Sequence, residues 1–201
     1  MIKIDKILVG THNKGKFKEL CYLLPKKIKK ISPQKLKIKS PRETGKTFSE
    51  NSKLKARYFC ERSKITSISD DSGLSINCLK GKPGIYSARW AKKYGSFKGA
   101  MKEIINMVTN KNKKQKNKDL KAKFICSLTI QQHKGKCINV TGTVHGKLSM
   151  KILGKNGFGY DPIFIANKYK KTFSQMGKKE KMLIDHRFIA YKKLMKKINF
   201  Q

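Results

Sequence analysis

The chain has 201 residues, 38% of them hydrophobic, which is enough for one domain with a buried core. Its 49 Lys and Arg residues outnumber 12 Asp and Glu residues, so the formal net charge is +37 at pH 7. The first residues lack the apolar core of a signal peptide, and no apolar run approaches the roughly 20 residues of a membrane span. These properties argue against a secreted or membrane protein and predict a cytoplasmic one.

The five cysteines are widely spaced and include no C-x-x-C pair, which predicts reduced thiols and argues against disulfides or a zinc site. A strongly basic chain invites a nucleic-acid interpretation. Its lysines, however, are spread almost evenly and accompany many Ile and Asn residues, as expected of translation from an AT-rich genome. The one dense charge run, residues 110–123, lacks aromatic residues for base stacking. We therefore predict a solvated loop there and no specific nucleic-acid partner.

A strand, a turn and a helix are predicted at the N-terminus. Residues 3–10 (KIDKILVG) are rich in β-branched and apolar residues, and the turn "THNKG" follows them. The helix carries apolar residues at positions i, i+3, i+4 and i+7, namely Phe17, Leu20, Cys21 and Leu24. Asn13 is its expected N-cap, and Pro25 ends it.

The next predicted elements are a short strand over residues 35–40 (KLKIKS), a turn-rich loop and a helix over residues 48–63. Ser49 is a candidate N-cap of this helix. We expect Leu54, Tyr58 and Phe59 on its buried side. Residues 64–69 (KITSIS) then predict a strand, with Asp70 and Asp71 where it ends. The carboxyl ends of strands are where α/β sheets bind ligands.

In the second half, Ser96 is expected to cap a helix that places apolar residues on one face: Phe97, Met101, Ile104, Ile105 and Val108. Residues 120–132 and 136–150 read as two strands of an antiparallel hairpin. A Gly-rich loop, a short strand over residues 163–166 and a helix from about Asp185 complete the chain. The mixture predicts an α/β fold, a mixed β-sheet with flanking helices, in a single domain over residues 1–201.

Polar clusters occupy four predicted loops or element ends: "THNKGK" (11–16), "ETGKTFSEN" (43–51), "SDDSG" (69–73), and "GFGYDP" with "EKMLIDHR" (157–162 and 180–187). Each has an ordinary structural alternative, such as a βα turn, a tight Asp turn, a charge favoured by a helix dipole, or a core aromatic residue. Together they describe a nucleoside-triphosphate site. The helix start with Lys14 and Lys16 suits phosphate, paired carboxylates suit Mg²⁺, and an aromatic, His and Arg cluster suits a base.

These motifs, in this order and spacing, closely resemble the inosine/xanthosine triphosphate pyrophosphatase family from about residue 4 to residue 195. The long "DDSGL…LKGKPGIYSAR" block is the most specific part of the match. The resemblance implies hydrolysis of non-canonical purine nucleoside triphosphates (ITP, dITP, XTP, dXTP) to the monophosphate and pyrophosphate, which keeps deaminated purines out of DNA and RNA. It also implies Mg²⁺ dependence, a homodimer, and an elongated two-lobed architecture with the active site in the cleft between the lobes.

The family pattern assigns roles to individual residues of this chain. The triphosphate would contact Thr11, His12, Asn13, Lys14, Gly15 and Lys16. Glu43 and Asp71 would bind the metal, Asp71 would be the catalytic base that activates water, and Ser72 would contact the substrate. The base and sugar would be held by Phe158, Gly159, Tyr160, Asp161, Lys181, His186 and Arg187. Arg187 has only hydrogen-bond donors, so it could read O6 of hypoxanthine or xanthine and disfavour the 6-amino group of adenine.

Three residues depart from the family pattern. His12 replaces a Gly, and we expect an unusual backbone angle there. Asp185 replaces a Ser, and Gln175 replaces a Glu. Two other function classes stay open at this point. One is a related pyrophosphatase that prefers pyrimidines or modified bases, and the other is a basic nucleic-acid-binding protein without activity.

Overall fold

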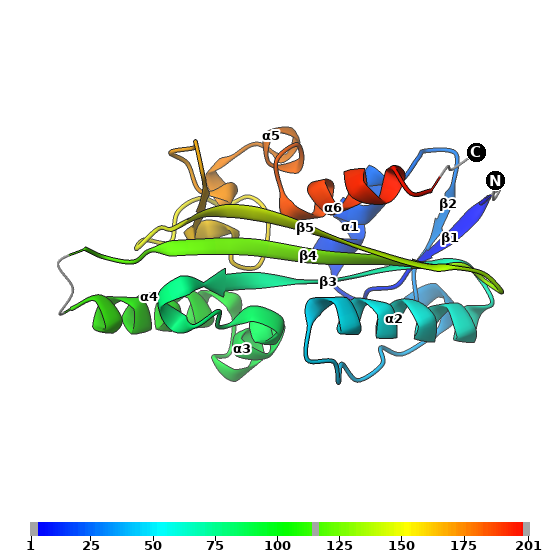
Figure 1. Cartoon of the computed structure of the whole chain (residues 1–201), viewed down its shortest axis with the longest axis horizontal. Coiled ribbons are helices and arrows are strands. Elements are labelled where there is room, and N and C mark those ends of the chain that lie inside the picture. The colour runs from blue at the N-terminus through cyan, green and yellow to red at the C-terminus, as the bar shows by residue number, and fades with distance from the viewer. Residues whose placement is uncertain (1–3, 114–116, 199–201) are drawn as a thin grey trace. The chain divides into compact units, whose positions relative to one another are not determined.

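The computed structural model of the chain describes residues 4–113 and 117–198 (Figure 1). The described residues form a six-stranded sheet in the order β2-β1-β3-β4-β5-β6. Strand β1 pairs in parallel with β2 and β3, whereas β5 and β6 pair antiparallel. The predicted mixed α/β fold is therefore confirmed. The chain forms two compact units, and the prediction of a single domain stays a prediction.

The first unit comprises the described parts of residues 1–71, 126–142 and 186–201. Figure 1 shows helices α1 (Lys14–Leu23) and α6 (His186–Met195) over one face of its sheet, and α2 (Phe48–Ser63) over the other. Side chains from β1 (Lys6–Val9), β3, β4, α1 and α6 share a buried apolar core that includes Ile7, Leu20, Ile68, Leu128 and Leu194.

The first predicted helix is confirmed, with Asn13 as its N-cap and its C-cap at Leu24. The strand predicted over residues 35–40 is wrong. Residues Gln34–Leu36 form a 3₁₀ turn after Pro33, and Lys37 takes a left-handed φ of 54°, which an extended run does not tolerate. The second strand is instead β2 (Lys29–Ile31), which pairs with β1.

Helix α2 has the predicted bounds, but its N-cap is Thr47, whose side chain accepts from the Glu50 N–H at 3.1 Å, and not Ser49. Phe59 is buried as predicted, whereas Leu54 and Tyr58 are half-buried. The buried face of α2 carries polar side chains (Asn51, Ser52 and Lys55) beside apolar ones (Ala56, Phe59 and Cys60). A helix face that buries polar side chains points to a functional surface rather than to an apolar core.

Strand β3 covers Ser67–Ile76, so Asp70 and Asp71 lie in its interior and the prediction that the strand ends there is wrong. A lysine faces each carboxylate, Lys16 at Asp70 and Lys55 at Asp71, and Gly73 allows a close approach further along the strand. A Cβ at Gly73 would overlap the Gly84 carbonyl and the Ser87 hydroxyl. Adjacent residues of a strand point to opposite faces, so Asp70 and Asp71 have different neighbours.

The second unit comprises residues 72–125 and 143–185 as far as they are described. It contains helices α3 (Ser87–Lys93), α4 (Phe97–Asn112) and α5 (Lys178–Met182) and strand β6 (Phe164–Ala166). Ser96 caps α4 as predicted, by accepting from the Gly99 N–H at 3.0 Å. Of the predicted apolar face, Met101, Ile104 and Val108 are buried, whereas Phe97 and Ile105 are half-buried.

Strands β4 (Lys121–Gln131) and β5 (Cys137–Leu148) are the predicted hairpin. The Gln132 N–H donates to the Lys136 carbonyl at 3.1 Å and closes the turn. The short strand and the C-terminal helix are also confirmed, while α3 and α5 were not predicted. Within the Lys/Asn run, α4 continues to Asn112 and β4 starts at Lys121; residues 114–116 lie outside the described residues.

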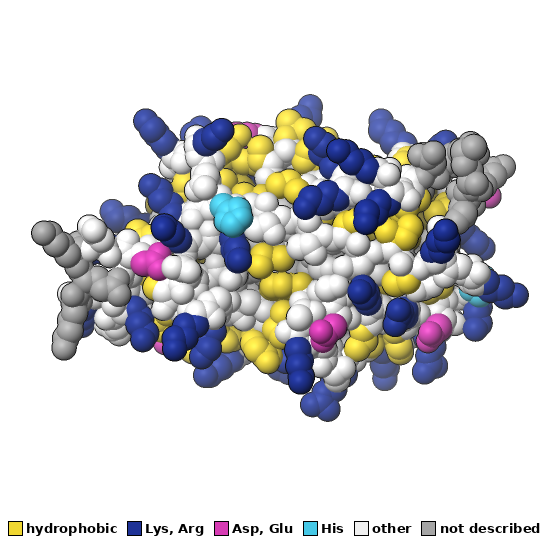
Figure 2. Space-filling view, in the orientation of Figure 1, with side chains coloured by type: hydrophobic (Ala, Val, Ile, Leu, Met, Phe, Trp, Pro, Cys, Tyr) yellow, Lys and Arg dark blue, Asp and Glu magenta, His cyan; other side chains and the backbone are white. Residues whose placement is uncertain are grey.

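All five cysteines are free thiols, as predicted. Burial raises the pKa of the Cys21, Cys60 and Cys78 thiols. Across the described part of the chain, no helix is both long and apolar enough to cross a bilayer. Figure 2 shows Lys and Arg side chains scattered over the visible face, with few acidic ones among them. This distribution agrees with a diffuse positive field rather than one concentrated basic patch on that face.

Candidate active site

The start of α1 is fixed by hydrogen bonds from its own side chains. The Thr11 hydroxyl accepts from the Asn13 N–H at 3.2 Å, and the Asn13 Oδ1 accepts from the Lys16 N–H at 3.0 Å. This arrangement fixes the turn from β1 into the helix, and Lys14 and Gly15 form its first turn. The N-terminal N–H groups of a ten-residue helix attract phosphate, and the exposed Lys14 adds a positive charge.

His12 does not have the unusual backbone angle that we expected. It is absent from the residues with a positive φ, so the expectation is wrong. The imidazole is accommodated to the side of the turn, where its Nδ1 lies 2.6 Å from the Ser40 hydroxyl and its ring lies 6.1 Å from the Phe59 ring. A bulky residue therefore fits here without backbone strain.

Asp70 faces the helices α1 and α6. Its Oδ2 lies 3.2 Å from the Lys16 Nζ and accepts from the Arg187 Nη2 at 3.0 Å, and its side chain is 0% exposed. Burial by itself would raise the pKa of Asp70, but the charges of Lys16 and Arg187 outweigh it and hold the pKa well below its usual range. Asp70 is therefore a permanently ionised partner of two cations.

Arg187 makes a second ion pair, between its Nη1 and the Glu19 carboxylate of α1. Its side chain is 1% exposed. The hypothesis that Arg187 reads O6 expects its donors to face a base, whereas here both Nη atoms donate to carboxylates. These contacts favour a supporting role, in which Arg187 ties α6 to α1 and β3.

Asp71 faces α2. Its Oδ1 lies 3.6 Å from the Lys55 Nζ, and its Oδ2 accepts from the Asn51 Nδ2 at 3.2 Å. Burial raises the pKa of Asp71, and the opposing charge of Lys55 does not cancel this effect. For Lys55, burial acts to lower the pKa, but the carboxylates of Asp71, Glu43 and Asp70 outweigh it and raise it. A carboxylate with a raised pKa near a phosphate site is a candidate general base.

Glu43 joins this cluster through the same lysine, because its Oε1 accepts from the Lys55 Nζ at 2.6 Å. Glu43 and Asp71 thus converge on one cationic group, which shows that both carboxylates can serve a single cation. No group of three or more His, Cys, Asp or Glu side chains with metal-site geometry occurs among the described residues. Two carboxylates completed by water and substrate phosphates are a common ligand set for Mg²⁺, so these residues fit that ion.

A second cluster lies in the second unit, in the loop that follows the hairpin. The Asp161 Oδ2 accepts from the Phe158 N–H at 3.0 Å and from the Lys181 Nζ at 2.7 Å. Gly157 and Gly159 take left-handed φ angles of 76° and 67°, which favour glycine. The Lys181 Nζ also lies 5.1 Å from the centre of the Phe158 ring. The loop therefore presents a half-buried aromatic ring beside a lysine.

Tyr160 belongs to the core beneath this loop. Its hydroxyl donates to the Ser87 carbonyl at 2.9 Å, its ring packs edge-to-face on Phe97 at 5.2 Å, and burial raises its pKa. Ser72 is half-buried at the start of the second unit, and His186 is buried at the start of α6. Of the other two departures from the family pattern, Gln175 closes a capping box with Thr172, and Asp185 is buried.

The Ham1 family model matches residues 7–197, almost the whole chain. The chain belongs to the Ham1 family. The family resemblance seen in the motifs is therefore confirmed. Two similar proteins are the dITP/XTP pyrophosphatases of Zymomonas mobilis and Dictyoglomus thermophilum, which are 35% and 38% identical. Each alignment covers 94% of this chain, with 90% and 91% of the relative, respectively.

Solved structures of Ham1 proteins share the fold. The protein from Coxiella burnetii superimposes with a TM-score of 0.84 at 29% identity, over 95% of this chain and 96% of the other. The Staphylococcus aureus Ham1 protein gives a TM-score of 0.81 at 33% identity over the same shares. This likeness over the full length agrees with the confirmed fold class.

Three residues that contact the expected site residues were not predicted from the sequence: Glu19, Asn51 and Lys55. The spacing of Asn51, Lys55 and Phe59, four residues apart, was the available signal, because it places all three on one face of α2. The apolar pattern favoured Leu54 and Tyr58 instead. Glu19 gave no signal, because an acidic residue within an amphipathic helix is ordinary.

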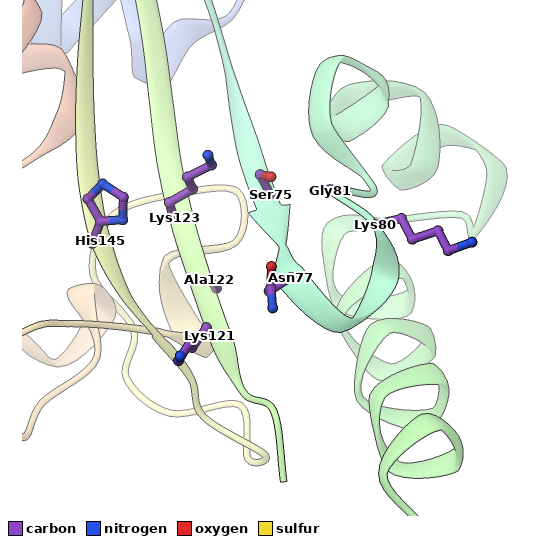
Figure 3. A pocket seen from close by; sticks show the side chains of 8 residues that line it. All are labelled: Ser75, Asn77, Lys80, Gly81, Lys121, Ala122, Lys123 and His145. Carbon is purple, nitrogen blue, oxygen red and sulfur yellow. The ribbon is translucent and has the colours of Figure 1, made fainter.

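A pocket of about 490 Å³ lies elsewhere in the second unit (Figure 3). It is lined by Ser75, Asn77, Lys80, Gly81, Lys121, Ala122, Lys123 and His145. Figure 3 shows Lys123 on β4 pointing towards Ser75 on β3, while Lys80 extends away from the strands. The lining contains none of the expected site residues and its basic side chains are exposed, so we do not assign the chemistry to it.

Proposed function

We propose that this chain hydrolyses non-canonical purine nucleoside triphosphates, ITP, dITP, XTP and dXTP, to the nucleoside monophosphate and pyrophosphate. The observation that carries the proposal is the buried Asp71 with its raised pKa, which shares Lys55 with Glu43. The names of the related dITP/XTP pyrophosphatases give the substrate class. Such an activity removes deaminated purines before they enter DNA and RNA.

We assign the triphosphate to the start of α1. The turn that Thr11 and Asn13 hold supplies backbone N–H groups, and Lys14 and Lys16 supply positive charge. Such fixed donors stabilise the charge that develops on phosphoryl oxygens during transfer. Lys16 also binds Asp70, so its position is set before substrate arrives.

We assign the attack on phosphorus to a water molecule that Asp71 deprotonates. Burial raises the pKa of Asp71, which makes its carboxylate a stronger base than an ordinary aspartate. Glu43 and Asp71 would hold Mg²⁺, which when bound neutralises phosphate charge and orients water. Lys55 adds a positive charge at the same place.

We assign the base and sugar to the loop of the second unit. The half-buried ring of Phe158 offers a stacking surface, and Lys181 and Asp161 offer a donor and an acceptor beside it. Tyr160 supports the loop from the core, and Ser72 and His186 are proposed as further substrate contacts. The homodimer, the cleft between two lobes and the cytoplasmic location stay predictions.

The test is an assay of pyrophosphate release by the purified protein with Mg²⁺. We expect rapid release from ITP, XTP and their deoxy forms, and slow release from ATP, GTP and pyrimidine triphosphates. Preference for a pyrimidine or modified base would overturn the purine assignment. No hydrolysis of any nucleotide, together with nucleic-acid binding, would overturn the enzyme. Release of orthophosphate in place of pyrophosphate would contradict the position of cleavage.

A further inference from the structure

Asn51 is a fully buried amide whose two ends contact different parts of the proposed site. Its Oδ1 accepts from the Gly45 N–H at 2.8 Å, and its Nδ2 donates to the Asp71 Oδ2 at 3.2 Å. A backbone N–H can only donate, so the oxygen of the amide must face Gly45 and its nitrogen must face Asp71. The orientation of the side chain is therefore determined by its neighbours.

The loop that carries Glu43 is seated on this amide. A Cβ at Gly45 would lie 2.7 Å from the Asn51 Oδ1 and 2.9 Å from the Asn51 backbone nitrogen, so only glycine allows the approach. The Asn51 N–H itself donates to the Thr47 carbonyl at 3.1 Å. One side chain of α2 thus joins the loop of one carboxylate, Glu43, to the second carboxylate, Asp71.

We propose that Asn51 is a positioning residue for the reaction, acting through Asp71. The terminal torsion of an aspartate is broad and roughly two-fold, so an unsupported carboxylate can rotate. The bond from the Asn51 Nδ2 holds the Oδ2, which leaves the Oδ1 as the oxygen directed at Lys55, 3.6 Å away. With Oδ2 engaged by Asn51, the carboxylate is held in one orientation in which it can accept a proton from water. This inference rests on the proposed function.

The same contacts determine what a substitution removes. Asn51→Leu keeps the number and branching of the side-chain heavy atoms but removes both hydrogen bonds. Asn51→Asp keeps an acceptor for the Gly45 N–H and removes the donor to Asp71. A misplacement of a reacting group by about 1 Å can cost roughly a hundredfold in rate. We therefore expect kcat for ITP to fall by about tenfold to a hundredfold in both variants.

Asn112 provides a matched control in the second unit. It is also a buried asparagine, and its amide donates to the Val108 carbonyl at 2.9 Å and accepts from the Asp119 N–H at 2.8 Å. The Asn112 amide also donates to the Asp119 carbonyl at 3.4 Å, so Asn112→Leu removes three hydrogen bonds of a buried asparagine without touching Asp71. We expect it to lower the unfolding midpoint as Asn51→Leu does, while kcat stays close to that of the wild type.

The experiment measures kcat, the unfolding midpoint and the Kd for a non-hydrolysable α,β-methylene analogue of ITP. A loss of kcat in the Asn51 variants, with Kd unchanged and a midpoint like that of Asn112→Leu, supports the proposal. Wild-type kcat in either Asn51 variant overturns it. Parallel losses of kcat and analogue binding, with a midpoint below that of the control, overturn it in favour of a structural role. If Asn51→Leu does not fold, Asn51→Asp is compared with Asn112→Asp, which makes the same chemical change away from Asp71.

A second measurement tests whether Asn51 acts through Asp71. In single-turnover reactions, adding Asn51→Leu to Asp71→Asn should leave the residual rate unchanged, because residues that act as a unit are not additive. A further loss equal to that of Asn51→Leu alone would overturn the proposal. Failure of the wild type to hydrolyse ITP would instead contradict the proposed function, so the two failures are distinguishable.

Discussion

Asp70 and Asp71 are neighbours on β3 and both are buried, with 0% and 4% of their surface exposed. On the side of α1 and α6, Lys16 and Arg187 surround Asp70, and its pKa is lowered. On the side of α2, Asp71 has Lys55 and the neutral amide of Asn51, and its pKa is raised. Burial is common to both carboxylates, so the direction of the shift depends on how much positive charge each side supplies.

The opposite pKa shifts suit the two carboxylates to different tasks. A carboxylate held far below its usual pKa is a weak base and a strong ion-pair partner, which suits Asp70 to fixing Lys16 and Arg187. A carboxylate with a raised pKa accepts a proton more readily, which suits Asp71 to activating water. Because one strand supplies both, a one-residue change of register would turn each carboxylate to the other face of the sheet.

Removal of divalent metal should stop the reaction completely while leaving the ion pairs of Asp70 intact. With excess EDTA we expect no pyrophosphate release from ITP and no change in the unfolding midpoint, because the oxygen ligands of Glu43 and Asp71 suit a catalytic and not a structural ion. Added Mg²⁺ should restore the rate. Full hydrolysis in excess EDTA would contradict the metal assignment.

Asp71→Asn should lower kcat by about 10²- to 10⁴-fold, the usual worth of a positioned general base. Folding raises the pKa of Asp71, so the ionised carboxylate is disfavoured by burial at neutral pH. Its neutral replacement should therefore leave the unfolding midpoint unchanged or raise it. Steady-state kinetics and thermal unfolding measure both. Turnover within about threefold of the wild type would show that another group is the base.

Asp70→Asn should chiefly lower the free energy of unfolding. It leaves Lys16 and Arg187 without this carboxylate, and breaking a buried ion pair costs about 3–5 kcal/mol. Urea unfolding at neutral pH measures the loss. A free energy of unfolding equal to that of the wild type would show that the pairs contribute nothing. Asp71→Asn is the matched control, since it makes the same chemical change one residue away.

The pH dependence of that loss has a definite sign. Folding lowers the pKa of Asp70, so its contribution is fully present above the unfolded value, near 3.9, and is lost as pH falls through the folded value. The difference in stability between the wild type and Asp70→Asn should therefore shrink below about pH 4. A difference that grew on acidification would contradict the lowered pKa.

The smallest expected effect is on base selectivity. Since the Arg187 guanidinium donates to Glu19 and Asp70, we expect Arg187→Ala to lower kcat/KM for ITP and ATP by the same factor. The O6 hypothesis predicts instead that the ITP-to-ATP ratio falls by about tenfold or more, the worth of a charged hydrogen bond. The ITP-to-ATP ratio of kcat/KM, measured at matched salt, decides between the two hypotheses. Arg187→Lys should not restore kcat/KM, because a lysine cannot donate to two carboxylates as the guanidinium fork does.

Local patterns in the sequence determined much of the scaffold. The apolar spacing and the caps at Asn13 and Ser96 located α1 and α4, and the alternating runs located the β4–β5 hairpin. These signals work because helix periodicity, capping and strand alternation depend on residues a few positions apart. The short strand β2 was not predicted, because three residues are too few to show the alternation of a strand.

Only the tertiary structure decided what the two neighbouring carboxylates meet. Arg187 is 117 residues from Asp70 and 168 from Glu19 in the sequence, and Lys55 and Asn51 reach Asp71 from a separate helix. The sequence placed both carboxylates at the end of a strand, whereas the interior of β3 sends them to opposite faces. The pKa of a buried group depends on every charge within a few ångströms, and those charges come together only when distant segments pack.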